Sequence, residues 1–192
     1  MNKAVFLDRD GVLNPLVFNP DTCAYEAPHR PEDFSVFTYT ARSLKLLRAN
    51  GFLNIVISNQ PDLAKGKATA DDLQKIAVMI SDYTKENGNL VEEFCYCYHH
   101  PDGIVEAYTQ ECLCRKPGTL FIESAIRKYD LDRTLCFMIG DRKSDMICGK
   151  NAGVRTIRIV ANNKQDYDID PGQICVPTLW EAVLLIVKDL TQ

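Results

Sequence analysis

The chain has 192 residues, a length that fits one compact domain large enough to bury most of its apolar surface. Its net charge of -4 argues against nucleic acid as the main partner, because no general electrostatic attraction favours it. No apolar run approaches the ~20 residues that span a bilayer, and the first residues lack a signal-peptide core, so we expect a cytoplasmic protein with no membrane partner.

Short apolar runs along the chain predict buried strands. They occupy residues 3–7, 52–57, 93–98, 135–139, 154–160 and 174–176. Helical patterns lie between them: a stripe ending at Gly51, a stripe starting at the N-cap pair Thr69 and Asp72, residues 120–129, a short helix ending near Gly153, and residues 179–190. Strands that alternate with helices predict an α/β domain, with a doubly wound, mostly parallel sheet covered on both faces.

Residues 15–31 contain four prolines and no clean period, so we interpret them as a long loop. Loops of that length inside compact domains are usually functional. No internal repeat, low-complexity tract or interdomain linker interrupts the sequence, and we expect residues 1–192 to form a single domain.

Two carboxylates, Asp8 and Asp10, follow the first strand, and Gly11 behind them allows a sharp turn. In an open α/β sheet, ligands gather beyond the carboxyl ends of the strands. One carboxylate is able to attack phosphorus and form an acyl phosphate, while the other protonates the leaving oxygen and later activates water. An aspartate pair in an ordinary surface turn is the alternative, and Asp-x-Asp alone does not decide between them.

Two further polar signatures lie near strand ends. Ser58-Asn59-Gln60 follows the second strand, where a hydroxyl and backbone N–H groups would bind phosphoryl oxygens. Lys116 would neutralise the nucleophile and the incoming phosphoryl group, and Arg115 offers a two-pronged fork for a substrate oxyanion. Serine and asparagine are also common turn residues, and two cations also fit a solvated surface, so neither signature is decisive alone.

The fourth signature covers residues 140–145, which read Gly-Asp-Arg-Lys-Ser-Asp and follow the strand predicted at 135–139. Asp141 is the expected magnesium ligand, because Mg²⁺ prefers a few carboxylates together with waters and phosphate oxygens. Asp145 would support that site from behind or hold a loop.

In this order, each after a strand, the four signatures resemble the haloacid-dehalogenase superfamily of aspartyl-phosphate phosphatases over nearly the whole chain. The resemblance implies a magnesium-dependent phosphatase with Asp8 as nucleophile and Asp10 as acid/base. It also implies that Ser58 and Lys116 stabilise the phosphoryl group, and that Asp8, Asp141 and the backbone carbonyl of Asp10 hold Mg²⁺. An aspartate at position 10 is typical of the phosphatases and is missing from the dehalogenase members.

Four of the eight cysteines cluster in one segment beside two histidines. Without a secretory signal, such clustering indicates metal binding rather than disulfides. Cys97 and His99, with Cys112 and Cys114, supply three thiolates and an imidazole, the ligands of a closed structural zinc site. His100 is an alternative to His99, and buried apolar cysteines are the alternative to a metal site. Because the last of these cysteines directly precedes the Arg-Lys pair, zinc would hold the loop that carries both cations.

Residues 97–117 resemble the zinc loop of the D-glycero-D-manno-heptose 1,7-bisphosphate phosphatases, with Cys-x-His-His-Pro followed by Cys-x-Cys-Arg-Lys-Pro. Bacterial histidinol-phosphatases close the same ligand types over a shorter loop, so the length favours the heptose enzymes. The resemblance implies removal of the C7 phosphate from a small phosphorylated sugar in nucleotide-heptose biosynthesis. It further implies that Arg115 and Arg142 contact the substrate and that no large cap domain covers the site.

Three departures from the family pattern bear on the substrate. Pro61-Asp62 replaces a common Ser-Gly pair, the stretch after Asn14 is several residues longer, and Arg142 stands where lysine is frequent. Histidinol phosphate and other small sugar phosphates therefore stay open as substrates. A non-catalytic zinc-stabilised binding module is the rival from another class, although a pure binder needs no such set of carboxylates and cations. We expect a monomer.

Overall fold

The computed structural model describes residues 2–160 and 170–189, and its centre is a six-stranded sheet. Across the sheet the order is β5-β4-β1-β6-β7-β8, and every neighbouring pair is parallel. The strands are β1 (Lys3–Leu7), β4 (Phe52–Asn59), β5 (Glu93–Cys97), β6 (Phe137–Gly140), β7 (Arg155–Ile159) and β8 (Cys175–Val176). The predicted doubly wound, mostly parallel fold is confirmed.

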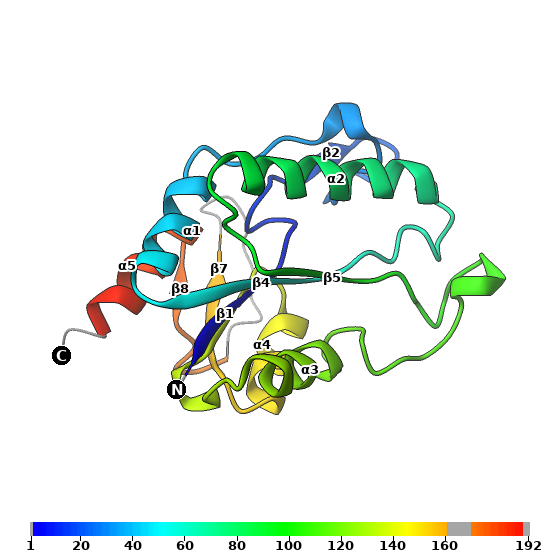
Figure 1. The fold of residues 1–192 in the computed structure, drawn as a ribbon. Coiled ribbons are helices and arrows are strands. Elements are labelled where there is room, and N and C mark those ends of the chain that lie inside the picture. The colour runs from blue at the N-terminus through cyan, green and yellow to red at the C-terminus, as the bar shows by residue number, and fades with distance from the viewer. Residues whose placement is uncertain (1, 161–169, 190–192) are drawn as a thin grey trace.

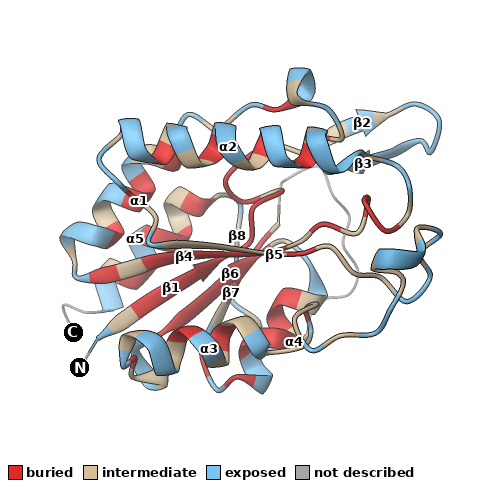
Figure 2. Ribbon diagram, turned by 45° about the vertical axis from the view of Figure 1, so that its right-hand side comes forward, coloured by how far each residue is buried: buried red, intermediate tan, exposed pale blue. Residues whose placement is uncertain are grey.

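Helices cover both faces of the sheet (Figure 1). On one side lie α1 (Thr40–Ala49), α2 (Ala70–Glu86) and α5 (Leu179–Asp189), and on the other lie α3 (Leu120–Tyr129) and α4 (Lys143–Asn151). Strand β1 shows why this arrangement forms, because successive side chains of a strand point to opposite faces. Val5 and Leu7 join the core under α1 and α5, whereas Ala4 and Phe6 join the core under α3. Figure 2 shows the central strands as almost continuously buried.

The order of the strands places the functional site. The chain moves from β1 outward through β4 to β5, then returns to β6 on the other side of β1. Loops that leave β1 and β6 therefore diverge toward opposite faces, and this opens a crevice at the carboxyl ends of the two strands. Gly11 lies in the loop after β1 with a φ of +80°, as the sharp turn requires.

Several predicted boundaries hold, and one strand starts later than expected. The expected N-cap is present at α2, where the Thr69 hydroxyl accepts a hydrogen bond from the backbone N–H of Asp72 at 3.1 Å. Residues Arg133–Leu135 form a short 3₁₀ helix, so β6 begins at Phe137 rather than at 135. Residue 190, the predicted end of the last helix, lies outside the described residues.

The interpretation of residues 15–31 as a long irregular loop is wrong. The segment contains an antiparallel hairpin of β2 (Val17–Asn19) and β3 (Ala24–Glu26), followed by the 3₁₀ helix η1 (Pro31–Asp33). Each strand is three residues long, too short to show an alternating pattern in the sequence. The hairpin stands beside the crevice at the carboxyl ends of the sheet. Within residues 2–160 and 170–189, no helix combines the length and apolar character needed to cross a membrane.

Candidate active site

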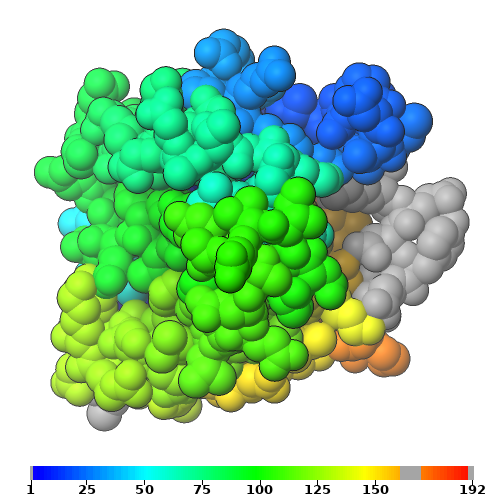
Figure 3. Space-filling view, turned by 90° about the vertical axis from the view of Figure 1, so that its right-hand side faces the viewer, coloured from blue at the N-terminus to red at the C-terminus, as the bar shows by residue number. Residues whose placement is uncertain are grey.

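Residues from all four predicted signatures meet in one cavity of about 220 Å³ at the carboxyl ends of the strands. The cavity is lined by residues of the loops after β1, β4 and β6, by the loop before α3 and by the β2–β3 hairpin: Asp8, Asp10, Tyr25, Glu26, Asn59, Asp62, Lys65, Lys67, Arg115, Lys116, Arg142 and Asp145. Figure 3 shows the bright green cysteine-bearing loop in the middle of this face and the blue hairpin at its upper right, with the segment after β4 between them.

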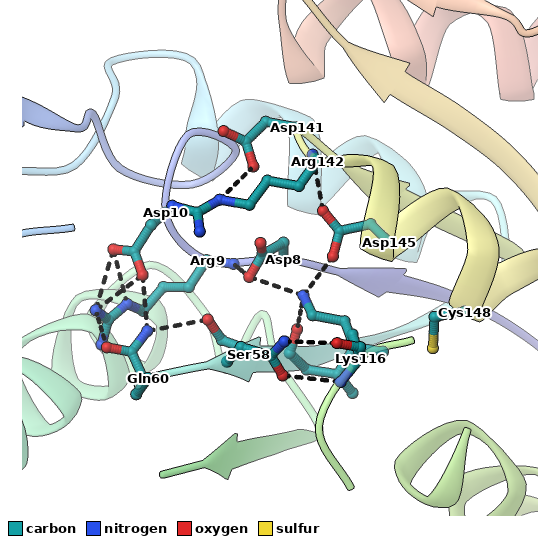
Figure 4. Close-up of polar contacts among 12 residues, drawn as sticks. Asp8, Arg9, Asp10, Ser58, Gln60, Lys116, Asp141, Arg142, Asp145 and Cys148 are labelled. Carbon is teal, nitrogen blue, oxygen red and sulfur yellow. Dashed lines mark hydrogen bonds and ion pairs between the residues drawn. The ribbon is translucent and has the colours of Figure 1, made fainter. Parts of the chain in front are cut away.

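Lys116 is the electrostatic centre of the cavity floor (Figure 4). Its Nζ lies 3.0 Å from Asp8 Oδ1 and 2.7 Å from Asp145 Oδ1, and it donates to the Ile57 carbonyl at 2.8 Å. These three acceptors match the three protons of an ammonium group. Burial alone would lower the pKa of Lys116, but the Asp145 and Asp8 carboxylates raise it above its usual value, so the lysine is charged.

Asp8 lies at the end of β1 and is 6% exposed. Its backbone N–H donates to the Ile139 carbonyl of β6 at 2.9 Å, which fixes the residue at the crevice between the two strands. Burial raises the pKa of the Asp8 carboxyl, and the Lys116 ammonium opposes that rise. A buried carboxylate held against a cation, and facing a cavity, has the arrangement of an activated nucleophile.

Three carboxylates are placed to share one metal ion: oxygens of Asp8, Asp141 and Asp145 lie within 4.8 Å of one another. Gly11 makes this possible, because a Cβ there would lie 2.6 Å from Asp141 Oδ2. The donors are hard oxygens, which suits Mg²⁺. Asp145 therefore belongs to the same group of oxygens as Asp8 and Asp141. The sequence predicted only a supporting position for it, behind the metal site. The expected contribution of Asp10 is its backbone carbonyl, and this stays a prediction.

The side chain of Asp10 is engaged elsewhere in the cavity floor. Asp10 Oδ1 accepts from Arg9 Nη2 at 3.0 Å and from Asn14 Nδ2 at 2.9 Å, and Oδ2 accepts from Gln60 Nε2 at 2.7 Å. Burial alone would raise the pKa of Asp10, but the Arg9 guanidinium and the two amides lower it below its usual value. No role was predicted for the Arg9 side chain, and Gln60 was named only as part of the Ser58-Asn59-Gln60 signature. The sequence offered one signal for Arg9, namely its position between two aspartates directly after a buried strand.

Ser58 and Asn59 end β4 in different surroundings. The buried Ser58 hydroxyl accepts from Gln60 Nε2 at 3.0 Å in the floor of the site (Figure 4), and its contact with a phosphoryl group stays a prediction. Asn59 lines the cavity, but its side-chain amide donates to the Lys116 carbonyl at 3.0 Å and accepts from the Lys116 N–H at 2.9 Å. The amide of Asn59 therefore holds the backbone of Lys116, and a direct substrate contact from this side chain stays a prediction.

The predicted zinc ligands also converge. Cys97, His99, Cys112 and Cys114 form one group whose ligand atoms lie within 4.8 Å of one another. Sulfur–sulfur distances are 3.3 to 3.5 Å, and His99 Nδ1 lies 3.6 Å from Cys114 Sγ. Neighbouring thiols lower the pKa of Cys112 to about 7 against the effect of burial. His100 Nδ1 instead accepts from the Asp102 N–H at 3.0 Å, so His99 rather than His100 belongs to this group.

Cations line the outer part of the cavity. Arg115 follows the cysteine cluster and donates to the His99 carbonyl at 3.4 Å, and Arg142 Nε lies 3.9 Å from Asp141 Oδ1. Both are cavity residues, and their contact with a substrate stays a prediction. Lys65 and Lys67 line it too, and sequence analysis did not single them out. Their only signal was a Lys-x-Lys pair behind the second predicted strand.

Comparison with known proteins identifies the family. Residues 113–182 match the HAD-hydrolase-like family model. The D-glycero-alpha-D-manno-heptose-1,7-bisphosphate 7-phosphatase of Photorhabdus laumondii is 35% identical over 152 residues, which cover 79% of either chain. This chain belongs to the heptose-bisphosphate phosphatase family of haloacid-dehalogenase-like hydrolases. A D-glycero-beta-D-manno-heptose-1,7-bisphosphate 7-phosphatase of Haemophilus ducreyi is 31% identical over 84% of this chain and 85% of its own.

Solved structures agree with the fold of this haloacid-dehalogenase-like hydrolase. D,D-heptose 1,7-bisphosphate phosphatase from B. bronchiseptica, complexed with magnesium and phosphate, superposes with a TM-score of 0.78. The match covers 98% of this chain and 99% of that one at 21% identity. A HAD-like phosphatase from Mesorhizobium loti gives a TM-score of 0.77, also at 21% identity, over 98% of this chain and 87% of that one. The resemblance to the superfamily and the predicted fold class are both confirmed.

Proposed function

We propose that the protein is a magnesium-dependent phosphatase that removes the C7 phosphate from D-glycero-D-manno-heptose 1,7-bisphosphate through an aspartyl-phosphate intermediate. The observation that carries the proposal is the contact of Lys116 Nζ with Asp8 at 3.0 Å, on a cavity floor that also holds Asp145. An Asp141 carboxylate oxygen lies within 4.8 Å of oxygens of both aspartates. The heptose-bisphosphate phosphatase names of its relatives support the choice of substrate.

In the first step an oxygen of Asp8 attacks phosphorus while the bond from phosphorus to the sugar oxygen breaks. Asp10 gives a proton to the leaving sugar oxygen, so it has to be protonated in the substrate complex, although Arg9 and two amides lower its pKa in the free site. Lys116 and the Ser58 hydroxyl contact the phosphoryl oxygens, on which negative charge accumulates. The products of this step are the dephosphorylated sugar hydroxyl and a phosphoryl group bonded to Asp8.

In the second step water attacks the same phosphorus. The Asp10 carboxylate accepts a proton from that water, and the bond from phosphorus to the Asp8 oxygen breaks. Inorganic phosphate leaves, Asp8 returns to its carboxylate form, and Asp10 is again protonated. One residue thus serves as acid and then as base, so the two steps together consume one water and leave both aspartates unchanged.

Two metals fit the residues present. Asp8, Asp141 and Asp145, together with the backbone carbonyl of Asp10, would hold Mg²⁺, which supplies positive charge beside the phosphoryl oxygens. The Cys97, His99, Cys112 and Cys114 group would hold a structural Zn²⁺. Four protein ligands leave no open position on such a zinc, so it fixes the loop rather than activating water.

The second phosphate of the substrate meets the outer cations in this proposal. Arg115 and Arg142 line the cavity, and their planar guanidinium groups suit a phosphate dianion. Glu26 and Tyr25 of the hairpin line the same cavity and face the sugar between the two phosphates. We further propose that residues 1–192 act as one catalytic domain, as a monomer in the cytoplasm.

The deciding experiment measures phosphate release from both anomers of heptose 1,7-bisphosphate, from histidinol phosphate and from other sugar phosphates, with and without Mg²⁺. We expect the highest kcat/KM on a heptose bisphosphate and no turnover without the metal. A preference for histidinol phosphate would reverse the choice of substrate. The number of chains per particle, measured by light scattering, tests the monomer.

Asp8→Asn tests the nucleophile and excludes a non-catalytic binding module. We expect a loss of about 10⁴-fold or more in kcat with an unchanged circular dichroism spectrum, because the amide is a poor nucleophile. Asp82→Asn is the matched control, because Asp82 is an exposed carboxylate on α2 that pairs with Lys85 at 3.0 Å. Full activity in Asp8→Asn would remove Asp8 from the nucleophile role.

A further inference from the structure

Arg9 is a buried cation for which the mechanism above has no use. It is 1% exposed and is among the largest fully buried side chains of the described residues. A guanidinium is costly to bury unless it is paired and hydrogen bonded. Its Nε lies 3.2 Å from Asp10 Oδ1, its Nη2 lies 3.0 Å from both Asp10 oxygens, and the ring of Tyr96 lies 5.7 Å from its Cζ. The two-pronged contact with Asp10 and the ring of Tyr96 therefore fix the orientation of the Arg9 guanidinium.

Gln60 links this pair to the phosphoryl-binding side of the floor. Its Oε1 accepts from Arg9 Nη2 at 2.9 Å, and its Nε2 donates to Asp10 Oδ2 at 2.7 Å and to Ser58 Oγ at 3.0 Å. The orientation of the amide is fixed, because Arg9 can only donate and an ionised Asp10 can only accept. One amide group thus contacts both the acid/base residue and a residue proposed to bind the phosphoryl group (Figure 4).

We propose that Gln60 and Arg9 are positioning residues that set the carboxyl group of Asp10 relative to the phosphoryl group held by Ser58 and Lys116. The inference rests on the proposed function, because it requires Asp10 to be the acid/base residue. Asn14 is the third side chain that holds Asp10, because its Nδ2 donates to Asp10 Oδ1 at 2.9 Å. All five hydrogen-bonded residues of this network, Arg9, Asp10, Asn14, Ser58 and Gln60, are 5% exposed or less, so water does not replace a missing partner freely.

The chemistry of the leaving group separates positioning from a structural role. A sugar oxygen is a poor leaving group and needs the Asp10 proton as its bond to phosphorus breaks, whereas p-nitrophenolate leaves without one. kcat/KM reports the steps up to departure of the leaving group. A displaced Asp10 should therefore lower kcat/KM for the sugar ester and spare the aryl ester. General damage to the fold or to Asp8 would lower both equally.

The test compares kcat/KM for the sugar bisphosphate and for p-nitrophenyl phosphate in Gln60→Met, which removes the amide at similar length. We expect a loss of about 10- to 100-fold on the sugar ester and less than about threefold on the aryl ester, a weaker form of the pattern from Asp10→Asn. Arg9→Lys keeps the charge but not the fork, so it should show the same selectivity and keeps the test valid if Gln60→Met does not fold.

Thr40→Val is the matched control, because it deletes one buried hydrogen bond, from Thr40 Oγ1 to the Leu13 carbonyl at 2.8 Å, outside the network. Its ratio of sugar to aryl kcat/KM should equal that of the wild type. Equal losses on both esters in Gln60→Met and Arg9→Lys, or no loss on either, would overturn the positioning role. If the wild-type protein releases phosphate from neither ester, the proposed function itself fails, and the inference fails with it.

Discussion

The floor and the rim of the cavity both contain ion pairs, but the pairs differ in burial. The ion pairs of the floor join Asp8, Lys116 and Asp145. We call the cavity-lining side chains of Glu26, Asp62 and Lys67, together with His29 that contacts the first two, the rim. In the Lys116 pairs the side chains are 0 to 9% exposed, whereas Lys67 is 36% and Glu26 is 18% exposed in the rim pair. The distances are similar, 2.7 to 3.0 Å, so distance alone does not rank the contacts.

The difference in burial changes what each contact does. In the floor, removing one charge leaves the others buried without compensation. In the rim, water screens the remaining charges, so the cost is small. The rim hydrogen bonds still order the hairpin: Glu26 accepts from Lys67 at 2.9 Å and from Asn19 at 3.0 Å, and these bonds lower the pKa of Glu26 to about 2. The buried charges of the floor therefore suit catalysis, whereas the hydrogen bonds of the rim fix the conformation of the hairpin.

The largest expected effect comes from removing the floor cation. Lys116→Met should lower kcat by about 10³-fold, because a preorganised charge beside the phosphoryl group is lost. It should also lower the free energy of unfolding by about 3 to 5 kcal/mol, because the Asp8 and Asp145 carboxylates stay buried without their partner. Urea unfolding and phosphate release measure the two quantities.

Lys67→Met is the matched change in the rim, since it removes the same group from the ion pair with Glu26. We expect a change of about 0 to 1 kcal/mol in unfolding free energy and an effect on KM rather than on kcat. Equal destabilisation by the two substitutions would show that burial does not separate the floor from the rim.

An intermediate effect is expected at the cysteine cluster. Cys112→Ser should reduce the zinc content from about one per chain to none and lower the free energy of unfolding by several kilocalories per mole. It should lower kcat by about 10- to 100-fold although no catalytic group is lost, because Arg115 and Lys116 directly follow Cys114 and a small displacement of reacting groups is costly.

Cys23→Ser is the control for this change, since Cys23 is an exposed free cysteine on the hairpin. Metal analysis of the purified protein and thermal unfolding in the presence of magnesium measure the outcome. A Cys112→Ser protein without zinc but with unchanged stability and kcat would contradict the role of the metal in holding the loop.

The sequence predicted part of the floor, because Asp8 directly follows an apolar run. Strands β1 and β4 and the helix α3 were visible as local patterns, and parallel strands bring their carboxyl ends to one edge of a sheet. Asp8 could therefore be placed at this edge from local patterns, whereas the position of Lys116 beside it was implied by the resemblance to the superfamily. The Cys and His residues of the proposed zinc site were also predictable, because residue type and spacing are enough to indicate such a site.

The remaining features depend on contacts that the sequence does not state. Asp145 was expected to support the metal site, but one turn of α4 brings it to Lys116 and Asp8. Arg9 and Gln60 lie 51 positions apart, and only the pairing of β1 with β4 brings them together. The hairpin was missed for two reasons. Its strands are only three residues long, too short for a periodic pattern. It is held instead by contacts with the rest of the rim, such as the hydrogen bond from Lys67 to Glu26.

The smallest expected effect is a pH dependence in the rim. His29 Nε2 lies 3.4 Å from Asp62 Oδ2 and 3.6 Å from Glu26 Oε2. The Asp62 carboxylate beside it raises the pKa of His29 above its usual 6.5, and burial and the Lys67 cation oppose that rise. Because the pKa is higher in the folded state, the stabilisation is complete below about pH 6.5 and is lost as the pH rises through the folded-state value.

His29→Gln should therefore lower the free energy of unfolding by about 0.2 to 1 kcal/mol at about pH 6 and leave it unchanged at about pH 9, a small effect because solvent screens the pair. Asp62→Asn removes the main partner of His29 and should abolish the same pH-dependent part. Urea unfolding of the wild type and both variants at the two pH values measures it. A larger loss at high pH than at low pH would have the wrong sign, and would show that His29 orders the hairpin as a neutral group rather than as a cation.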